Sequence, residues 1–241
     1  MLSYIQPEDS WDDVVFLIPC FNDVQLLEQV LHTLPPEAYK LIIDDGSSTS
    51  VAQKLTVINN DKLIVIRHII NLGQGAAIET GFQYLRERWD ALRASFVVTF
   101  DADGQHRIED VRHMLKQIRQ GNIDLILGSR FLALGYKHFS GGFLKYLILR
   151  YSAFISRFTI GLPLTDRHNG LRILTREAVN SIRVTQNGYG HADEILREIQ
   201  RHKLRYVESQ VTIDYPKFTS ARGQSLLNAF NIVFRRMFGA K

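Results

Sequence analysis

The chain has 241 residues, of which 45% are hydrophobic and 22% are charged, proportions typical of a globular protein and not of a disordered or fibrous one. This length fits one large domain with a substantial core. A single cysteine, Cys20, excludes an intramolecular disulfide and a cysteine-based zinc site, and residues 1–13 lack the basic and apolar parts of a signal peptide, so we expect a cytoplasmic protein.

The net charge of +4 conceals two halves of opposite sign. Acidic residues outnumber basic ones by 18 to 12 in residues 1–136, whereas basic residues outnumber acidic ones by 17 to 7 in residues 137–241. An acidic half indicates a bound cation, and a basic half indicates phosphates or an anionic surface. A chance distribution of solvated charge is the alternative.

Short apolar runs alternate along the chain with stretches of helical spacing. The runs typical of buried strands are residues 14–18, 40–44, 63–66, 96–100 and 124–128. Apolar residues recur at helical spacing in residues 24–34, 77–85 and 111–118. This alternation predicts an α/β fold with a mostly parallel central sheet flanked by helices. Ligands of such sheets bind beyond the carboxyl ends of the strands, where polar clusters follow four of the five runs.

Two segments that follow the second and third runs permit both a structural and a functional interpretation. "LIIDDGSSTS" places Asp44 and Asp45 at a strand end, where they either form a turn with Ser47 or Ser48 as the N-cap of the next helix or bind a base or ribose. "NLGQGAAIETG" has spaced glycines, including Gly73 and Gly75, which either form a simple loop or bring backbone N–H groups close to a ligand.

The segment "FVVTFDADGQH" is more informative. An apolar strand runs directly into Asp101 and Asp103, two carboxylates that repel each other unless a positive charge lies between them. Carboxylate oxygens suit Mg²⁺ or Mn²⁺, and Mg²⁺ commonly binds one or two carboxylates together with substrate phosphates. We therefore expect a divalent ion that bridges to a diphosphate; a solvated acidic turn is the alternative.

Six segments, "IPCFND", "IIDDGSS", "NLGQGAAIETG", "FDADGQH", "LGSRF" and "DRHNGLRILTREA", match in order and spacing the family 2 glycosyltransferases with a GT-A fold. The chain resembles most the dolichyl- or polyprenyl-phosphate mannosyl- and glucosyltransferase branch, over about residues 13–215. The resemblance implies a single GT-A domain over residues 1–241. Residues 13–130 would form its nucleotide-sugar-binding half, and residues 131–241 its acceptor- and membrane-facing half.

The resemblance also implies roles for particular residues. The nucleotide base and ribose would contact Pro19, Phe21, Asp23 and either Asp44 or Asp45. The diphosphate would be held through Mg²⁺ or Mn²⁺ by Asp101, Asp103 and Gln105, with Ala102 in the same donor site. Arg130 and Arg172 would join Asp103 in catalysis by serving the donor diphosphate or the acceptor phosphate, since an arginine fork donates two hydrogen bonds to phosphate oxygens. A salt bridge between Arg172 and Asp166 is the structural alternative.

The chain departs from the family pattern at three places. Asp23 stands where a glutamate is common, Arg107 replaces a proline, and His168–Asn169 replaces a smaller pair. These departures leave the donor sugar and base open.

Asp193 and Glu194 in "GYGHADEILREIQ" are candidates on the acceptor side. In family members that glycosylate a hydroxyl, a carboxylate near this position is the general base, whereas a lipid phosphate is already anionic and needs none. The alternative is a pair of first-turn acids that interact with the helix dipole. Further along the basic half, Arg222 of "FTSARGQS" is expected to close over the donor phosphates as part of a mobile loop.

Two segments predict contact with a membrane surface. Residues 141–162 are long enough for a membrane span, but Lys145, Arg150 and Arg157 interrupt them and lie in one sector of a helical wheel. A basic stripe opposite an apolar face is typical of a helix in the membrane interface, and the C-terminal "SLLNAFNIVFRRMFGAK" has a similar pattern. Packing on the core or in a homodimer is the alternative.

Together these observations predict an inverting glycosyltransferase that moves a hexose from a nucleotide sugar of the GDP-mannose or UDP-glucose class to a polyprenyl phosphate. The enzyme would be peripheral at the inner face of the membrane, with no nucleic acid as a partner. One alternative is a family 2 enzyme that glycosylates a saccharide hydroxyl in cell-surface polysaccharide synthesis. The other is a catalytically silent nucleotide-sugar-binding or membrane-adaptor subunit.

Overall fold

The computed structural model describes residues 10–55, 61–132, 160–188 and 190–213, together with residues 146, 147, 150, 151 and 154. The strands are β1 (Val14–Cys20), β2 (Tyr39–Asp44), β3 (Leu63–Arg67), β4 (Phe96–Thr99), β5 (Leu125–Ser129), β6 (Arg172–Thr175) and β7 (Tyr206–Gln210). The helices are α1 (Val24–Thr33), α2 (Val51–Lys54), α3 (Gln74–Leu92), α4 (Ile108–Arg119), α6 (Arg176–Ser181) and α7 (His191–Arg201).

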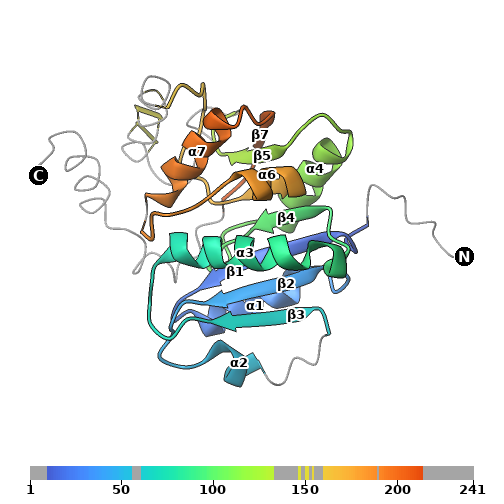
Figure 1. Cartoon of the computed structure of the whole chain (residues 1–241), viewed down its shortest axis with the longest axis vertical. Helices are drawn as coiled ribbons and strands as arrows, with labels where there is room; N and C mark the ends of the chain where they lie inside the picture. Colours follow the sequence, from blue (N-terminus) through green and yellow to red (C-terminus); the bar gives the residue numbers. More distant parts are fainter. Residues whose placement is uncertain are drawn as a thin grey trace, which may run out of the picture.

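The seven strands form one sheet in the order β3-β2-β1-β4-β6-β5-β7 (Figure 1). All neighbouring strands run parallel except β6, which is antiparallel to both β4 and β5. The prediction of an α/β fold with a mostly parallel central sheet is confirmed. The five predicted strands correspond to β1–β5, whereas β6 and β7 were not predicted.

Helices cover both faces of the sheet. Alternate residues of β1 and β2, such as Leu17 and Ile43, pack with α3, α6 and α7 on one face. The intervening residues, such as Phe16 and Ile42, pack with α1, α2 and α4 on the other. Because helices cover both faces, a strand such as β1 is apolar along its length, which is why a continuous apolar run identified it.

The antiparallel strand β6 matters for the position of the site. Its first residue, Arg172, pairs with Thr99 at the end of β4, so β6 begins at the edge where the parallel strands end. The chain segments before β6 and after β1, β2, β4 and β5 therefore meet at one edge of the sheet.

Candidate active site

The segments after β1 and β2 are tied to each other by hydrogen bonds. Asn22 donates its backbone N–H to Ser47 Oγ (3.0 Å), and its side-chain carbonyl accepts from the backbone N–H of Ser48 (2.9 Å). Beside them, the Phe21 side chain is 45% exposed, while Pro19 and Asp23 are half-buried. The predicted contacts of these three residues with base and ribose stay predictions.

Asp44 and Asp45 are both buried and hold loops of their own chain. Asp44 accepts backbone hydrogen bonds from Ser47 (2.9 Å) and Val51 (3.1 Å). Asp45 bonds to His68 and accepts from the backbone N–H groups of residues 72 and 73 at 2.9 and 2.8 Å. The turn of the structural interpretation is therefore present, but its N-cap prediction is wrong, since Ser50 and not Ser47 or Ser48 precedes α2. A contact of either aspartate with the base stays a prediction.

The glycines at the start of α3 allow another segment to pack closely against it. A Cβ at Gly73 would collide with the carbonyl of Asn187, and one at Gly75 would collide with the carbonyl of Gln186. The Gly75 N–H donates to the Asn187 carbonyl (2.8 Å), and the Gly73 N–H donates to Asp45. Both N–H groups predicted to face a ligand are thus used within the chain.

Asp101 lies at the centre of the strand-end edge, and its side chain is 31% exposed. Its Oδ1 accepts a hydrogen bond from Gln74 Nε2 (3.1 Å), and its Oδ2 lies 3.0 Å from His106 Nε2. A Cβ at Gly170 would lie 2.7 Å from Asp101 Oδ2. A side chain at position 170 would therefore displace the Asp101 carboxylate, which lies directly against the backbone there.

The two carboxylates of the Asp-X-Asp segment have opposite electrostatic environments. Burial disfavours ionisation of Asp101, but its hydrogen bond with His106 and the charge of Arg172 lower its pKa below the usual value. At Asp103, burial and then the negative charge of Asp101 raise the pKa, with a smaller contribution from Asp23. The negative charge of Asp101 is thus partly balanced by its neighbours, whereas that of Asp103 is not.

The residues present fit a divalent ion of the Mg²⁺ or Mn²⁺ type. Two neighbouring carboxylates offer hard oxygen ligands, and the raised pKa of Asp103 beside Asp101 means that a nearby cation would stabilise both in their ionised forms. Gln105, the third predicted ligand, donates its backbone N–H to Asp103 Oδ1 (3.0 Å). The described residues contain no cluster of three or more His, Cys, Asp or Glu side chains around one point, so substrate oxygens would have to complete the coordination.

Arg130, which follows β5, is held by Asp166. Its Nε and Nη2 donate to the two carboxylate oxygens at 2.6 and 2.8 Å, and its backbone N–H donates to the same carboxylate (3.1 Å). This arginine lowers the pKa of Asp166 despite the burial of that carboxyl. Glu208 of β7 in turn accepts the backbone N–H groups of Thr165 and Asp166 at 2.9 and 3.1 Å, which fixes the turn that carries the pair.

Arg172 is only 2% exposed, yet its guanidinium has no ion pair or side-chain hydrogen bond within the part of the chain that the structure describes. Burial lowers its pKa to about 10, against the opposing attraction of Asp101, Asp166 and Asp193. The alternative that Arg172 forms a salt bridge with Asp166 is wrong, since Arg130 takes that partner. A buried cation without a partner is costly, and such a group is typical of a site that binds an anion.

Asp193 and Glu194 at the start of α7 are both engaged. Asp193 is 1% exposed and pairs with Arg167, while Glu194 accepts the backbone N–H groups of Thr185 and Gln186, each at 2.8 Å. Burial opposes ionisation of Glu194, but these hydrogen bonds lower its pKa. The predicted role of Asp193 as a base stays a prediction.

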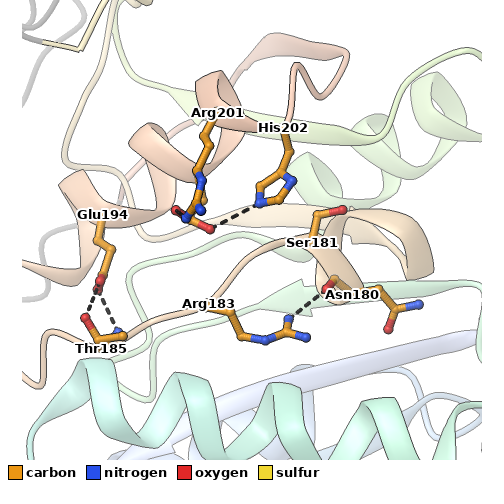
Figure 2. Close-up of a pocket in the computed structure, with 8 residues that line it drawn as sticks. Asn180, Ser181, Arg183, Thr185, Glu194, Arg201 and His202 are labelled. Atoms are coloured by element: carbon orange, nitrogen blue, oxygen red, sulfur yellow. Dashed lines mark hydrogen bonds and ion pairs between the residues drawn. The ribbon is translucent and has the colours of Figure 1, made fainter.

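A surface groove lies between α6 and α7 (Figure 2). It is lined by Asn180, Ser181, Arg183, Thr185, Glu194, Glu198, Arg201 and His202. Glu194 is the only candidate residue in it, and the figure shows that carboxylate turned toward Thr185. The groove is therefore distinct from the edge of the sheet at which the other candidate site residues lie.

Arg222 and the C-terminal amphipathic segment lie outside the described residues. Of the predicted helix over residues 141–162, five positions before residue 160 are described, and all are helical. Leu147, Tyr151 and Phe154 among them are 46%, 52% and 58% exposed. No described helix has the length and apolarity needed to cross a bilayer.

Three residues at the centre of the site were missed by the sequence interpretation. Gln74 and His106 both lie within the motifs quoted above, but roles there were assigned only to their neighbours. Gly170 lies in "DRHNGLR", where only Arg172 had been assigned. A polar residue flanked by glycines was the available signal for Gln74, whereas the contact of Gly170 with Asp101 joins positions far apart in the chain.

Comparisons with known proteins agree with this arrangement. A family model described as "Glycosyl transferase family 2" matches residues 15–183. The UDP-N-acetylglucosamine–dolichyl-phosphate N-acetylglucosaminyltransferase of Methanococcus voltae is 28% identical over 244 residues, covering 93% of this chain and 95% of that protein. The undecaprenyl-phosphate mannosyltransferase of Micrococcus luteus is 27% identical over 208 residues, covering 83% and 82%.

Solved structures share the fold. Glucosyl-3-phosphoglycerate synthase from Mycobacterium tuberculosis, in complex with Mn²⁺, uridine-diphosphate and phosphoglyceric acid, gives a TM-score of 0.62 at 14% identity, covering 95% of this chain and 79% of that chain. The predicted GT-A fold is confirmed by this likeness. Since the family model spans most of the chain and the strand-end carboxylates and arginines lie at one edge, this protein belongs to glycosyl transferase family 2.

Proposed function

We propose that the protein is an inverting glycosyltransferase that moves a hexose from a nucleoside diphosphate sugar to a polyprenyl phosphate. The observation that carries the proposal is Arg172, a buried guanidinium without a partner among the described residues, next to the carboxylate of Asp101. At this edge of the sheet, the arginine can bind an anionic substrate and the two carboxylates can bind a metal ion that carries a diphosphate. The relatives named above, which act on dolichyl and undecaprenyl phosphates, support this acceptor class.

The donor is proposed to lie across the ends of β1, β2 and β4. Its base would lie near Phe21 and Asp23, and its diphosphate near Asp101 and Asp103. The donor class is GDP-mannose or UDP-glucose. A Mg²⁺ or Mn²⁺ ion held by Asp101, Asp103 and Gln105 would neutralise charge that develops on the leaving diphosphate.

The proposed transfer reaction does not require the protein to remove a proton from the acceptor. A phosphate oxygen of the acceptor attacks the anomeric carbon, and the bond from that carbon to the donor diphosphate breaks, with its electron pair leaving on the nucleoside diphosphate. The new bond forms on the opposite face of the sugar, which inverts the anomeric configuration. Since a phosphate monoester with a second pKa of about 6 is largely ionised at neutral pH, no base has to remove a proton.

Arg130 and Arg172 are proposed to position the phosphates for this step. Asp166 holds the Arg130 guanidinium in one orientation after β5. Arg172 supplies the uncompensated charge for the acceptor phosphate or the donor diphosphate. Such preoriented charges stabilise a transition state at little reorganisation cost.

We also propose that the enzyme lies on the membrane surface. The exposed Leu147, Tyr151 and Phe154 are spaced by four and three residues, which places them on one side of a helix, and the exposed Arg150 lies beside them. An apolar stripe flanked by a cation is typical of a helix in the membrane interface. This location would bring the strand-end edge to an acceptor whose hydrocarbon chain lies in the bilayer.

A donor screen tests the proposal. The purified protein is incubated with Mn²⁺ or Mg²⁺, a defined polyprenyl phosphate in detergent, and GDP-mannose, UDP-glucose or UDP-N-acetylglucosamine carrying a labelled sugar. We expect label in the chloroform-soluble fraction from one donor, and none after EDTA treatment. Label that appears only in water-soluble saccharide would contradict the lipid acceptor and support the hydroxyl-acceptor alternative.

A further inference from the structure

Both carboxylate oxygens of Asp101 are held by side chains from two different elements. Gln74, the first residue of α3, donates from Nε2 to Oδ1 at 3.1 Å. His106, in the loop between β4 and α4, places Nε2 3.0 Å from Oδ2. Together they fix the plane of the carboxylate as well as its position.

The backbone around Gln74 is fixed on both sides. The preceding Gly73 donates its N–H to Asp45 (2.8 Å), and the following Gly75 donates its N–H to the carbonyl of Asn187 (2.8 Å). The close approach of residues 186 and 187 is possible only because positions 73 and 75 lack a Cβ. The two glycines therefore hold the glutamine between them in place.

His106 is fixed by packing. Its side chain is 3% exposed, and its ring lies 5.3 Å from the Phe100 ring, centroid to centroid, in an edge-to-face arrangement. The backbone of His106 also pairs with Ile213 beyond β7. Within the described part of the chain, Nε2 of the ring has a hydrogen-bond partner, whereas Nδ1 is buried without one. The one hydrogen bond of this ring among the described residues is thus with Asp101.

We propose that Gln74 and His106 are positioning residues that orient Asp101 toward the divalent ion and the donor diphosphate. This inference rests on the metal site of the proposed function. Groups that hydrogen-bond a ligating carboxylate orient it, and their loss commonly weakens metal binding by about 10- to 100-fold. Neither residue touches the reacting atoms; both act through Asp101.

The test measures Mn²⁺ binding directly, with no transfer reaction. Free Mn²⁺ is followed by electron paramagnetic resonance during titration of the protein with and without UDP or GDP. Q74L removes the donor at similar size, and H106F removes it while keeping a ring on Phe100. We expect each variant to bind Mn²⁺ about 10- to 100-fold more weakly than the unmodified protein.

Two further variants serve as comparisons. H106Q retains a side-chain N–H that can reach Asp101, so we expect it to recover most of the affinity lost in H106F. Q83L changes a glutamine of the same helix whose only side-chain hydrogen bond in the described residues is a long one of 3.5 Å to Glu79, and we expect no change in affinity. Melting temperatures are measured for all variants, and H106Q and Q74L decide the question if H106F does not fold.

The outcomes separate this inference from the proposed function. Mn²⁺ affinities of Q74L and H106F within twofold of the unmodified protein, or an unmodified protein that binds no Mn²⁺, would overturn the inference. Weakened Mn²⁺ binding in both variants supports it even if the donor screen finds no lipid-linked product, a result that would count against the proposed acceptor alone.

Discussion

At the level of single residues, Arg130 and Arg172 differ in how the fold treats their charge. Arg130 donates to both oxygens of Asp166, so its charge is neutralised within the fold. Arg172 is more deeply buried and has no such partner among the described residues. The ion pair of Arg130 contributes to stability, whereas the burial of Arg172 has a cost that the nearby carboxylates offset only in part and that a bound anion would reduce further.

This contrast predicts that R172M loses activity without losing stability. Removal of an unpaired buried charge should leave the free energy of unfolding within about 1 kcal/mol of the unmodified protein, or increase it. Glycosyl transfer should fall by about 10²- to 10³-fold, the usual effect of losing one preoriented charge at a reacting centre. Urea unfolding and initial rates measure the two effects, and a large loss of stability with unchanged rates would refute this account of Arg172.

The opposite result is predicted for D166N. Breaking a buried ion pair by removing one partner costs about 3 kcal/mol, since Arg130 loses its carboxylate. The folded state lowers the pKa of Asp166, so its stabilising contribution is complete above the unfolded pKa of about 3.9 and is lost as the pH falls below that value. The difference in unfolding free energy between the two proteins should therefore narrow as the pH falls below about 4.

An exposed ion pair provides the matched control for D166N. Asp90 is 84% exposed and pairs with Arg176, so D90N should change the unfolding free energy by less than about 0.5 kcal/mol at any of these pH values. A D166N protein as stable as D90N at neutral pH would show that the Arg130–Asp166 pair does not hold the turn before β6.

At the level of single elements, variants in helix α7 can distinguish a phosphate acceptor from a hydroxyl acceptor. Its first turn carries Asp193, paired with Arg167, and Glu194, bonded to residues 185 and 186. If the acceptor is a phosphate, neither carboxylate is needed as a base. We expect the D193N/E194Q protein to keep its transfer rate to within about tenfold, whereas loss of a general base costs about 10²- to 10⁴-fold.

The single variants D193N and E194Q are measured beside the double variant. Loss of the Asp193–Arg167 pair lowers stability, and a lower melting temperature distinguishes this effect from lost chemistry. A well-folded double variant with a rate reduced by three orders of magnitude would favour the saccharide-hydroxyl alternative.

Strands with a continuous apolar run could be predicted from the sequence, and strands that depend on tertiary pairing could not. β1 to β5 were predicted because runs such as residues 14–18 are apolar throughout. β6 has only four residues and takes its place by antiparallel pairing with β4 and β5, which no local pattern indicates. β7 contains polar residues such as Glu208 and has only one buried position, so it lacks an apolar run.

The same limit applies to the candidate site. Asp101 and Asp103 were identified from spacing alone, because two carboxylates after an apolar strand need a cation. The partner of Arg130 lies 36 residues further along the chain, and the hydrogen bond between Gln74 and Asp101 spans 27 residues. Contacts between residues so far apart in the chain form only when folding brings the strand ends together, so the sequence alone does not predict them.

For the whole molecule, the proposed function assigns the meeting with the acceptor to the sheet edge and to the exposed helical positions before residue 160. The exposed Leu147, Tyr151 and Phe154 predict that the protein binds vesicles containing anionic lipid. The L147S/Y151S/F154S protein should bind such vesicles at least about tenfold more weakly in a sedimentation assay, since three apolar side chains no longer enter the interface. Unchanged vesicle binding would assign membrane contact to another segment.

The proposed function depends on a divalent ion that is coordinated by Asp101 and Asp103 and binds the donor diphosphate. The most direct measurement is a crystal structure of the protein with Mn²⁺ and UDP or GDP, with data collected at the manganese absorption edge. We predict one strong anomalous peak within coordination distance of oxygens from Asp101 or Asp103 and from the diphosphate. A nucleotide bound at this edge with both carboxylates turned away from it, and no anomalous peak between them, would contradict the account.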